Sequence, residues 1–199
     1  MRFATFSHKP LIIHVKRLNT VVKWIQRNPK KLVYPFLQSS PVHLRLISDA
    51  AFKKEETKGH ALRGSLYLVA TGGDEESFMR ASSIHVVEQM TKGLRHVTRS
   101  TFAAELFAGC DTVDLGILIL TLLDELEYGA RSCSEQRKLR ENGGHVVPMT
   151  LQVDAQSVYA AITALFIKAP AEKSLLSHVQ YMRAIRFRHS TPNSLGLHP

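Results

Sequence analysis

The chain has 199 residues, 44% of them hydrophobic, which is enough for one buried core and argues against disorder throughout. Twenty-six lysines and arginines against 17 acidic residues give a formal charge of +9 and a pI near 9.8. This balance suits a polyanionic partner such as nucleic acid, although ribosomal, chromatin and membrane-surface proteins share it. The two cysteines, Cys110 and Cys133, form no CxxC pair and have no histidine at zinc-ligand spacing, so we expect reduced intracellular thiols.

The chain contains no segment that predicts export or membrane insertion. Its longest apolar run, residues 115–123, is about half as long as a membrane-spanning helix requires, so we expect a buried helix segment and no membrane partner. A basic stretch without an apolar signal core follows Met1, so we expect no secretion signal. We expect an intracellular protein, with cytoplasm and nucleus both left open.

The N-terminal part predicts one amphipathic helix with a basic face between His14 and Arg27. Asn28-Pro29 ends it, because a proline disfavours helical geometry in the residue before it. A short linker at 38–41 follows. We therefore expect an N-terminal segment at 1–40, a main domain at 41–189 and a loose tail at 190–199.

Three strands are predicted next. Apolar and polar residues alternate over residues 42–49, which places Asp49 at the C-terminal end of the first strand. Residues 64–71 and 84–90 form the second and third strands, separated by the turn residues Gly72-Gly73-Asp74. Because the connections are short, we expect an antiparallel meander.

A long helix is predicted from Thr101 to about Glu127, with apolar positions at steps of four and three. Gly109 and Gly116 lie seven residues apart on nearly one face of it. A glycine inside a helix costs up to about 1 kcal/mol, so the pair indicates close approach to a sheet, with a merely weak helix as the alternative. We expect a surface loop at 128–144.

The remaining pattern predicts a fourth strand and two more helices. Residues 146–153 alternate and lead into Asp154, a short helix follows, and a further helix covers residues 172–188. In this α/β order the first and fourth strands can lie side by side and parallel, which brings Asp49 and Asp154 together. Glu105, at the start of the long helix, would point at the same place. Three such carboxylates can hold a pair of divalent metal ions.

Three segments resemble motifs of the ribonuclease H domain of copia-type retrotransposon polyproteins. Ser48-Asp49-Ala50 resembles the opening strand motif of that family, residues 100–106 its helix-start motif, and Asp154-Ala155-Gln156-Ser157 its fourth-strand motif. The resemblance covers roughly residues 15–188. It implies a ribonuclease H-like mixed sheet, with an antiparallel three-strand meander and parallel strands, flanked by helices. It also implies that residues 1–40 are a tether remaining from the connection to reverse transcriptase.

The resemblance implies Asp49, Glu105 and Asp154 as catalytic metal ligands that hold two Mg²⁺ or Mn²⁺ ions and hydrolyse the RNA strand of an RNA/DNA hybrid. The parent reverse transcriptase polyprotein would be a second partner, and no small-molecule cofactor is expected. Family members usually carry a fourth acid where this chain has Gln180, a degenerate ligand that coordinates only through a neutral carbonyl oxygen. Ala51 and Ala155 also replace polar residues of the family, so the enzyme would be impaired.

Five residues are candidates for nucleic-acid contact, each with a solvated surface position as the alternative: Arg99, Arg95, Lys53, Lys54 and His178. His178 is more simply interpreted as a partly exposed helix residue. Two other functions compete with the nuclease. A degenerate, inactive retroelement copy would at most bind nucleic acid, and an integrase or resolvase of similar topology would need a different spacing of the acids.

Overall fold

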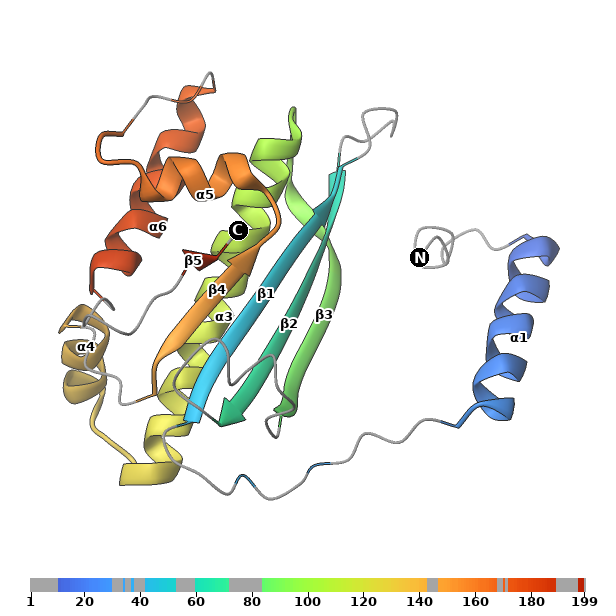
Figure 1. The fold of residues 1–199 in the computed structure, drawn as a ribbon, viewed down its shortest axis with the longest axis horizontal. Coiled ribbons are helices and arrows are strands. Elements are labelled where there is room, and N and C mark those ends of the chain that lie inside the picture. The colour runs from blue at the N-terminus through green and yellow to red at the C-terminus, as the bar shows by residue number, and fades with distance from the viewer. Residues whose placement is uncertain are drawn as a thin grey trace. The chain divides into compact units, whose positions relative to one another are not determined.

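The computed structural model describes residues 11–29, 34, 37, 42–52, 60–71, 84–142, 147–167, 170, 172–188 and 197–198. The chain divides into two compact units, Met1–Tyr34 and Pro35–Pro199, which we describe separately. The first unit contains α1 (Ile12–Arg27), labelled in Figure 1. None of the residues of this helix is buried. The helix predicted between His14 and Arg27 is therefore present and begins two residues earlier.

The second unit is built on a five-stranded mixed sheet (Figure 1) in the order β3-β2-β1-β4-β5. The antiparallel meander consists of β1 (Val42–Ala51), β2 (His60–Thr71) and β3 (Ile84–Val97). Parallel strands β4 (Met149–Val153) and β5 (Leu197–His198) continue the sheet from β1. The predicted α/β class and mixed sheet are confirmed, with β2 and β3 longer than expected.

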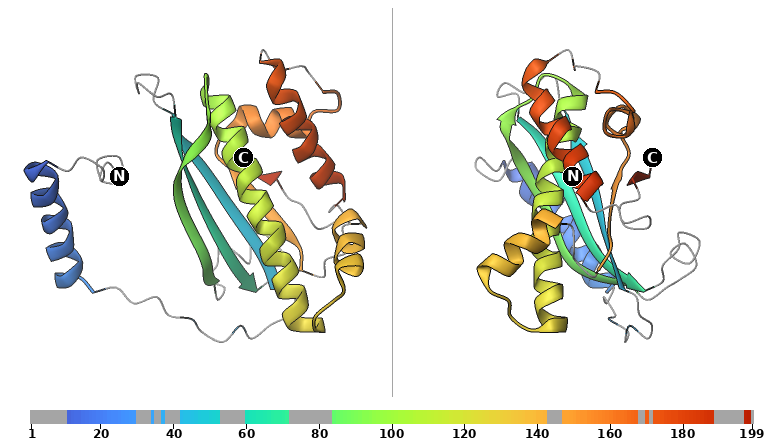
Figure 2. Two further views of the ribbon diagram at one scale, coloured as in Figure 1. Left: turned by 180° about the vertical axis from the view of Figure 1, so that it is seen from behind. Right: turned by 90° about the vertical axis from the view of Figure 1, so that its left-hand side faces the viewer.

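The long helix α3 (Thr101–Tyr128) lies along one face of the sheet (Figure 2). Its first turn is fixed by Ser100, whose side chain accepts a hydrogen bond from the Ala103 N–H at 3.1 Å. It ends at Gly129, which adopts a φ of 84° that favours glycine. By length and composition α3 is apolar enough to cross a membrane, but half of its most apolar window is buried, as in a core helix of a globular domain.

The close approach predicted from the two glycines occurs at one of them. A Cβ on Gly116 would lie 2.5 Å from Cδ1 of Leu46 in β1 and 3.1 Å from Sδ of Met149 in β4, so only glycine fits there without a shift. A Cβ on Gly109 would meet Met182 Cε at an ordinary 3.7 Å. Gly116 therefore sets how closely α3 packs on the two central strands.

The prediction of a surface loop at 128–144 is wrong for most of this range, because α4 (Cys133–Asn142) forms there. Ser132 and Glu135 cap this helix reciprocally. The Ser132 N–H donates to Glu135 Oε2 at 2.9 Å, and the Glu135 N–H donates to Ser132 Oγ at 3.4 Å. Cys133 is thus helical rather than in a loop, and its thiol is exposed and free, whereas that of Cys110 is buried and free.

The C-terminal helices pack beside α3 and β4. They are α5 (Gln156–Thr163) and α6 (Leu176–Arg188), the second preceded by a single 3₁₀ turn, Lys173–Leu175. The buried Arg183 of α6 donates to the carbonyl oxygens of Ala164 at 2.6 Å and Leu165 at 3.4 Å, which joins α6 to the end of α5. The predicted tail at 190–199 lies outside the described residues except for β5.

Candidate metal centre

The parallel pairing of β1 and β4 brings two of the acids together. In this register Ser48 of β1 lies opposite Val153 of β4, so the next residues of the two strands, Asp49 and Asp154, emerge side by side. Neighbouring strands lie about 4.8 Å apart, which is within reach of two short carboxylate side chains. Asp154 directly follows β4 and precedes α5, where the backbone turns away from the sheet.

The third acid comes from α3. The backbone N–H of Ala50 in β1 donates to Glu105 Oε1 at 3.2 Å, so the strand that carries Asp49 also fixes the Glu105 carboxylate. The small residues Ala104 and Ala108 pack with Ala50 in a buried cluster and allow helix and strand to approach closely. Glu105 is only 4% exposed.

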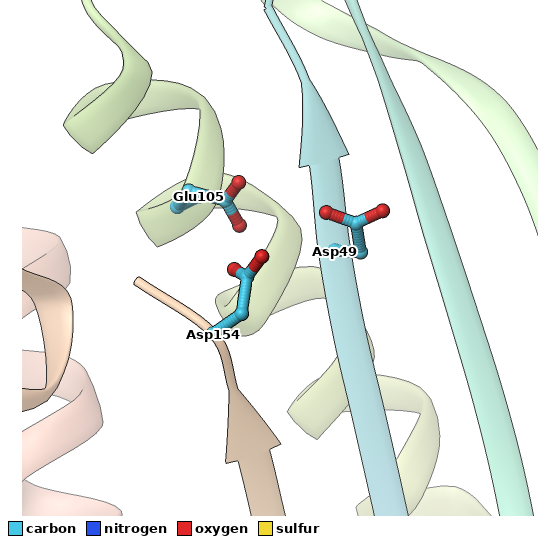
Figure 3. Close-up of side chains that lie close together, drawn as sticks. All are labelled: Asp49, Glu105 and Asp154. Atoms are coloured by element: carbon cyan, nitrogen blue, oxygen red, sulfur yellow. The ribbon is translucent and has the colours of Figure 1, made fainter. Parts of the chain in front are cut away.

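The three carboxylates point toward one another from β1, α3 and the end of β4 (Figure 3). One oxygen of each of Asp49, Glu105 and Asp154 lies within 4.8 Å of the others. Asp49 and Asp154 are exposed, whereas Glu105 is buried behind them. The arrangement therefore has a closed side at α3 and an open side toward solvent.

Burial and the neighbouring negative charges change the pKa of Glu105. Burial, reinforced by the charges of Asp154 and Asp49, raises the pKa of Glu105 from 4.5 to about 7, and the hydrogen bond from Ala50 opposes the rise. In the absence of a cation, the buried carboxyl group is thus protonated over much of the acidic range. A bound divalent cation would favour its ionised form.

The residues fit a hard divalent cation. Within the described ranges no lysine or arginine forms an ion pair with these three carboxylates, and no donor reaches the buried Oε2 atom of Glu105. A buried carboxylate oxygen without a hydrogen-bond partner is costly. Carboxylate oxygens are the ligands that Mg²⁺ and Mn²⁺ prefer, so Asp49, Glu105 and Asp154 could each supply one ligand atom.

Three of the five predicted nucleic-acid contacts, Arg95, Arg99 and His178, lie in the described ranges. Arg95 of β3 and Arg99, which precedes α3, are both exposed, and Lys53 and Lys54 fall outside the residues that the structure describes. The half-buried His178 of α6 packs edge-on against Phe107, with ring centroids 4.7 Å apart. Its surroundings are those of a packed helix residue.

Gln180 is exposed on α6. Its interpretation as a degenerate fourth ligand stays a prediction.

The sequence did not predict a cavity of about 860 Å³ that opens between the start of α3, α5 and the segment before α6. Arg99, Ser100 and Phe102 line one side of it, and Ser157 and Glu172 line the other. The only signal in the sequence is a set of small residues that line the space: Ala160 and Ala161 of α5, and Ala164 directly after it. Arg99 therefore borders a concave surface near the helix that carries Glu105.

No protein-family model matches this chain, and no curated protein sequence matches it. Among solved structures, it is similar to LC11-RNase H1, isolated from compost by a metagenomic approach, with 11% identity over 78% of this chain and 82% of the other, at a TM-score of 0.43. It is also similar to LC11-RNase H1 in complex with an RNA/DNA hybrid, with 11% identity over 78% of this chain and 85% of the other, at a TM-score of 0.41. At these values we draw no functional conclusion from the likeness.

Proposed function

We propose that this protein is a metal-dependent ribonuclease H-type endonuclease that hydrolyses the RNA strand of RNA/DNA hybrids. The observation that carries the proposal is the convergence of Asp49, Glu105 and Asp154, whose ligand atoms lie within 4.8 Å of one another. Ligands of a single metal pair should be separated by roughly 3 to 7 Å. The three motifs around these acids resemble those of copia-type ribonuclease H domains. This resemblance indicates the reaction and the substrate class.

Each acid would have a distinct position relative to the substrate. Glu105 accepts a hydrogen bond from the Ala50 N–H and is only 4% exposed, so it would form the inner side of the metal centre. Asp49 and Asp154 are exposed and would complete the centre on the side where a phosphate can approach. Two bound Mg²⁺ or Mn²⁺ ions would supply an activated water molecule and stabilise charge on the leaving oxygen.

Recognition of the hybrid would depend on its backbone rather than on base sequence. Phosphate contacts orient a nucleic acid, and the 2′-hydroxyl groups in the shallow minor groove distinguish RNA from DNA. The exposed Arg99 and Arg95 are candidates for phosphate contact. The resemblance also supports a retroelement origin, in which residues 1–40 are a tether from reverse transcriptase and the protein acts inside the cell.

Cleavage of a labelled hybrid tests the proposal. The purified chain with Mg²⁺ or Mn²⁺ should cut the RNA strand of the hybrid and leave single-stranded RNA, duplex RNA and duplex DNA intact. The Asp154→Asn variant should lose cleavage, because it removes one anionic ligand while keeping the size of the side chain. An intact hybrid with both metals, from a chain with a folded circular dichroism spectrum, would contradict the proposal.

A second function is favoured by one observation, the neutral Gln180 where the resembled family has a fourth acid. A copy that lacks this charge could hold metal weakly and bind nucleic acid without cutting it. Binding of the hybrid and of Mn²⁺ without any cleavage would identify this inactive form. Cleavage by the wild type would exclude it.

A further inference from the structure

Almost all of the net positive charge lies in the first unit of the chain. Residues 1–34 contain eight lysines and arginines and no acidic residue, and the first acid of the whole sequence is Asp49. The other 18 lysines and arginines, all in residues 35–199, are opposed by all 17 acidic residues, which leaves +1. The unit with the acid cluster is therefore nearly neutral, and the unit with α1 carries +8 of the total of +9.

Three of these charges form a row on α1. Lys16, Lys23 and Arg27 are spaced by seven and four residues, so they share one face of the helix and span about 16 Å at 1.5 Å per residue. All three are exposed, and none forms an ion pair with a residue in the described ranges. We call Lys16, Lys23 and Arg27 the basic row. These three cations lie on one face of α1 and are exposed to solvent.

Several cations of the second unit, by contrast, are already paired. Arg63 pairs with Asp111, Arg131 with Asp124 and Arg137 with Glu141. A unit with a net charge of only +1, three of whose cations are paired, attracts a polyanion weakly at long range. Its metal centre also consists of three acids, which repel the phosphates of a nucleic acid when no cation is bound. A nuclease built on this unit alone would have little electrostatic hold on its substrate.

We infer that the basic row of α1 is a phosphate-binding surface that holds the nucleic acid on which the acid cluster acts. The inference rests on the proposed function, because it takes the substrate to be a nucleic acid. Each phosphate contact releases a counterion, so the row should supply most of the salt-dependent affinity of the whole chain. The predicted contacts Arg95 and Arg99 would then orient the hybrid rather than capture it.

The opposite face of α1 fits a different kind of partner. It presents exposed apolar residues: Val15, Leu18, Val22 and Ile25. A helix with an apolar face and a basic face can also lie on an anionic membrane. Nucleic acid is favoured because the same chain carries a carboxylate cluster suited to phosphate chemistry. Binding to lipid vesicles distinguishes a membrane from nucleic acid.

The experiment compares two quadruple variants of the full chain. Both carry Asp154→Asn, so that binding is measured without cleavage. One adds Lys16→Gln, Lys23→Gln and Arg27→Gln in the basic row. The matched control adds glutamine at three exposed lysines of the second unit, Lys92, Lys138 and Lys173. Both sets remove the same charge, and glutamine preserves helix propensity in α1.

Fluorescence anisotropy with a labelled RNA/DNA hybrid is measured between about 50 and 200 mM salt. The basic-row variant should bind about tenfold or more weakly, and the slope of log K against log salt should fall by about 2 to 3. The control should change both quantities much less. Equal effects of the two quadruple variants, or no binding of the hybrid by the chain that carries Asp154→Asn alone, would overturn the inference.

A second arm uses vesicles of phosphatidylcholine with about a quarter phosphatidylserine. Co-sedimentation that depends on the basic row, together with hybrid binding that does not, would assign α1 to a membrane and overturn the inference. Failure of the proposed function gives a different pattern. In that case the wild type would not cut the hybrid, yet the loss of binding would still be specific to the basic row.

Discussion

Glu105 Oε1 accepts a hydrogen bond at 3.2 Å from the N–H of Ala50, the residue that follows Asp49 in β1. One backbone position thus fixes the distance between the buried acid on the helix and the exposed acid on the strand. The bond uses one of the two Glu105 oxygens and leaves Oε2 buried without a donor among the described residues. This free oxygen is available to a metal ion, and its burial disfavours the charged form of Glu105.

Removing either exposed acid should abolish tight metal binding. We expect Asp49→Asn and Asp154→Asn to weaken the binding of Mn²⁺ by about tenfold to a hundredfold, because each replaces an anionic ligand with a neutral one of the same shape. Isothermal titration calorimetry of Mn²⁺ measures the loss. Asp114→Asn is the control, because Asp114 is an exposed carboxylate of α3 that accepts a hydrogen bond from Tyr181 and lies outside the cluster. Similar affinities in all three variants would place the metal elsewhere.

The stability of the metal-free protein should fall as the pH rises from about 5 to 8. The pKa of Glu105 is raised from 4.5 to about 7 by burial and by its acidic neighbours. Between these values the folded state binds more protons than the unfolded state, so the free energy of unfolding decreases with pH, by about 1 to 3 kcal/mol in total. Mn²⁺ should restore the stability at high pH. Urea unfolding in EDTA at several pH values measures the effect.

Glu105→Gln provides the decisive comparison for that pH dependence. The free energy of unfolding of this variant should not decrease as the pH rises. Without metal at high pH, the variant should be more stable than the wild type, because glutamine has no charge to bury. Glu127→Gln removes an exposed carboxylate from the same helix and should keep the decrease. A wild-type curve parallel to that of Glu105→Gln would show that Glu105 ionises normally.

The two glycines of α3 should respond in opposite directions to substitution by alanine. Gly116→Ala should destabilise the fold, because its Cβ would meet Leu46 and Met149, both buried, and overpacking costs about 1 to 3 kcal/mol. Gly109→Ala should stabilise it by up to about 1 kcal/mol, the difference in helix propensity, since its Cβ meets only ordinary contacts. Urea midpoints compare the two. Changes of the same sign would contradict the packing described for Gly116.

The order of the elements, with a long helix between the third and fourth strands, was enough to show that β1 and β4 can be parallel neighbours, because parallel strands need a crossover connection of this kind. The sequence could not predict how strongly Glu105 is desolvated. That depends on Ala104 and Ala108 packing against Ala50, a contact between residues more than 50 positions apart.

The missed helix α4 has a different cause. Residues 133–142 are mostly polar, so they carry no apolar period to indicate a helix. The pair Ser132 and Glu135, a serine followed three positions later by glutamate, is a start signal that was present in the sequence. Local capping therefore held the information that hydrophobic periodicity lacked.

Gln180→Asp tests whether the neutral residue limits the metal centre. The exposed Gln180 lies on α6, which packs against α3, the helix of Glu105, through contacts such as His178 on Phe107. If it occupies the place of the fourth acid of the resembled family, a new carboxylate should increase the affinity for a second Mn²⁺ and raise hybrid cleavage by about tenfold. Ser177→Asp, an exposed position on the same helix, controls for added negative charge. If the two substitutions have equal effects, or if neither has an effect, Gln180 does not belong to the metal centre. Any impairment of cleavage would then come from another residue.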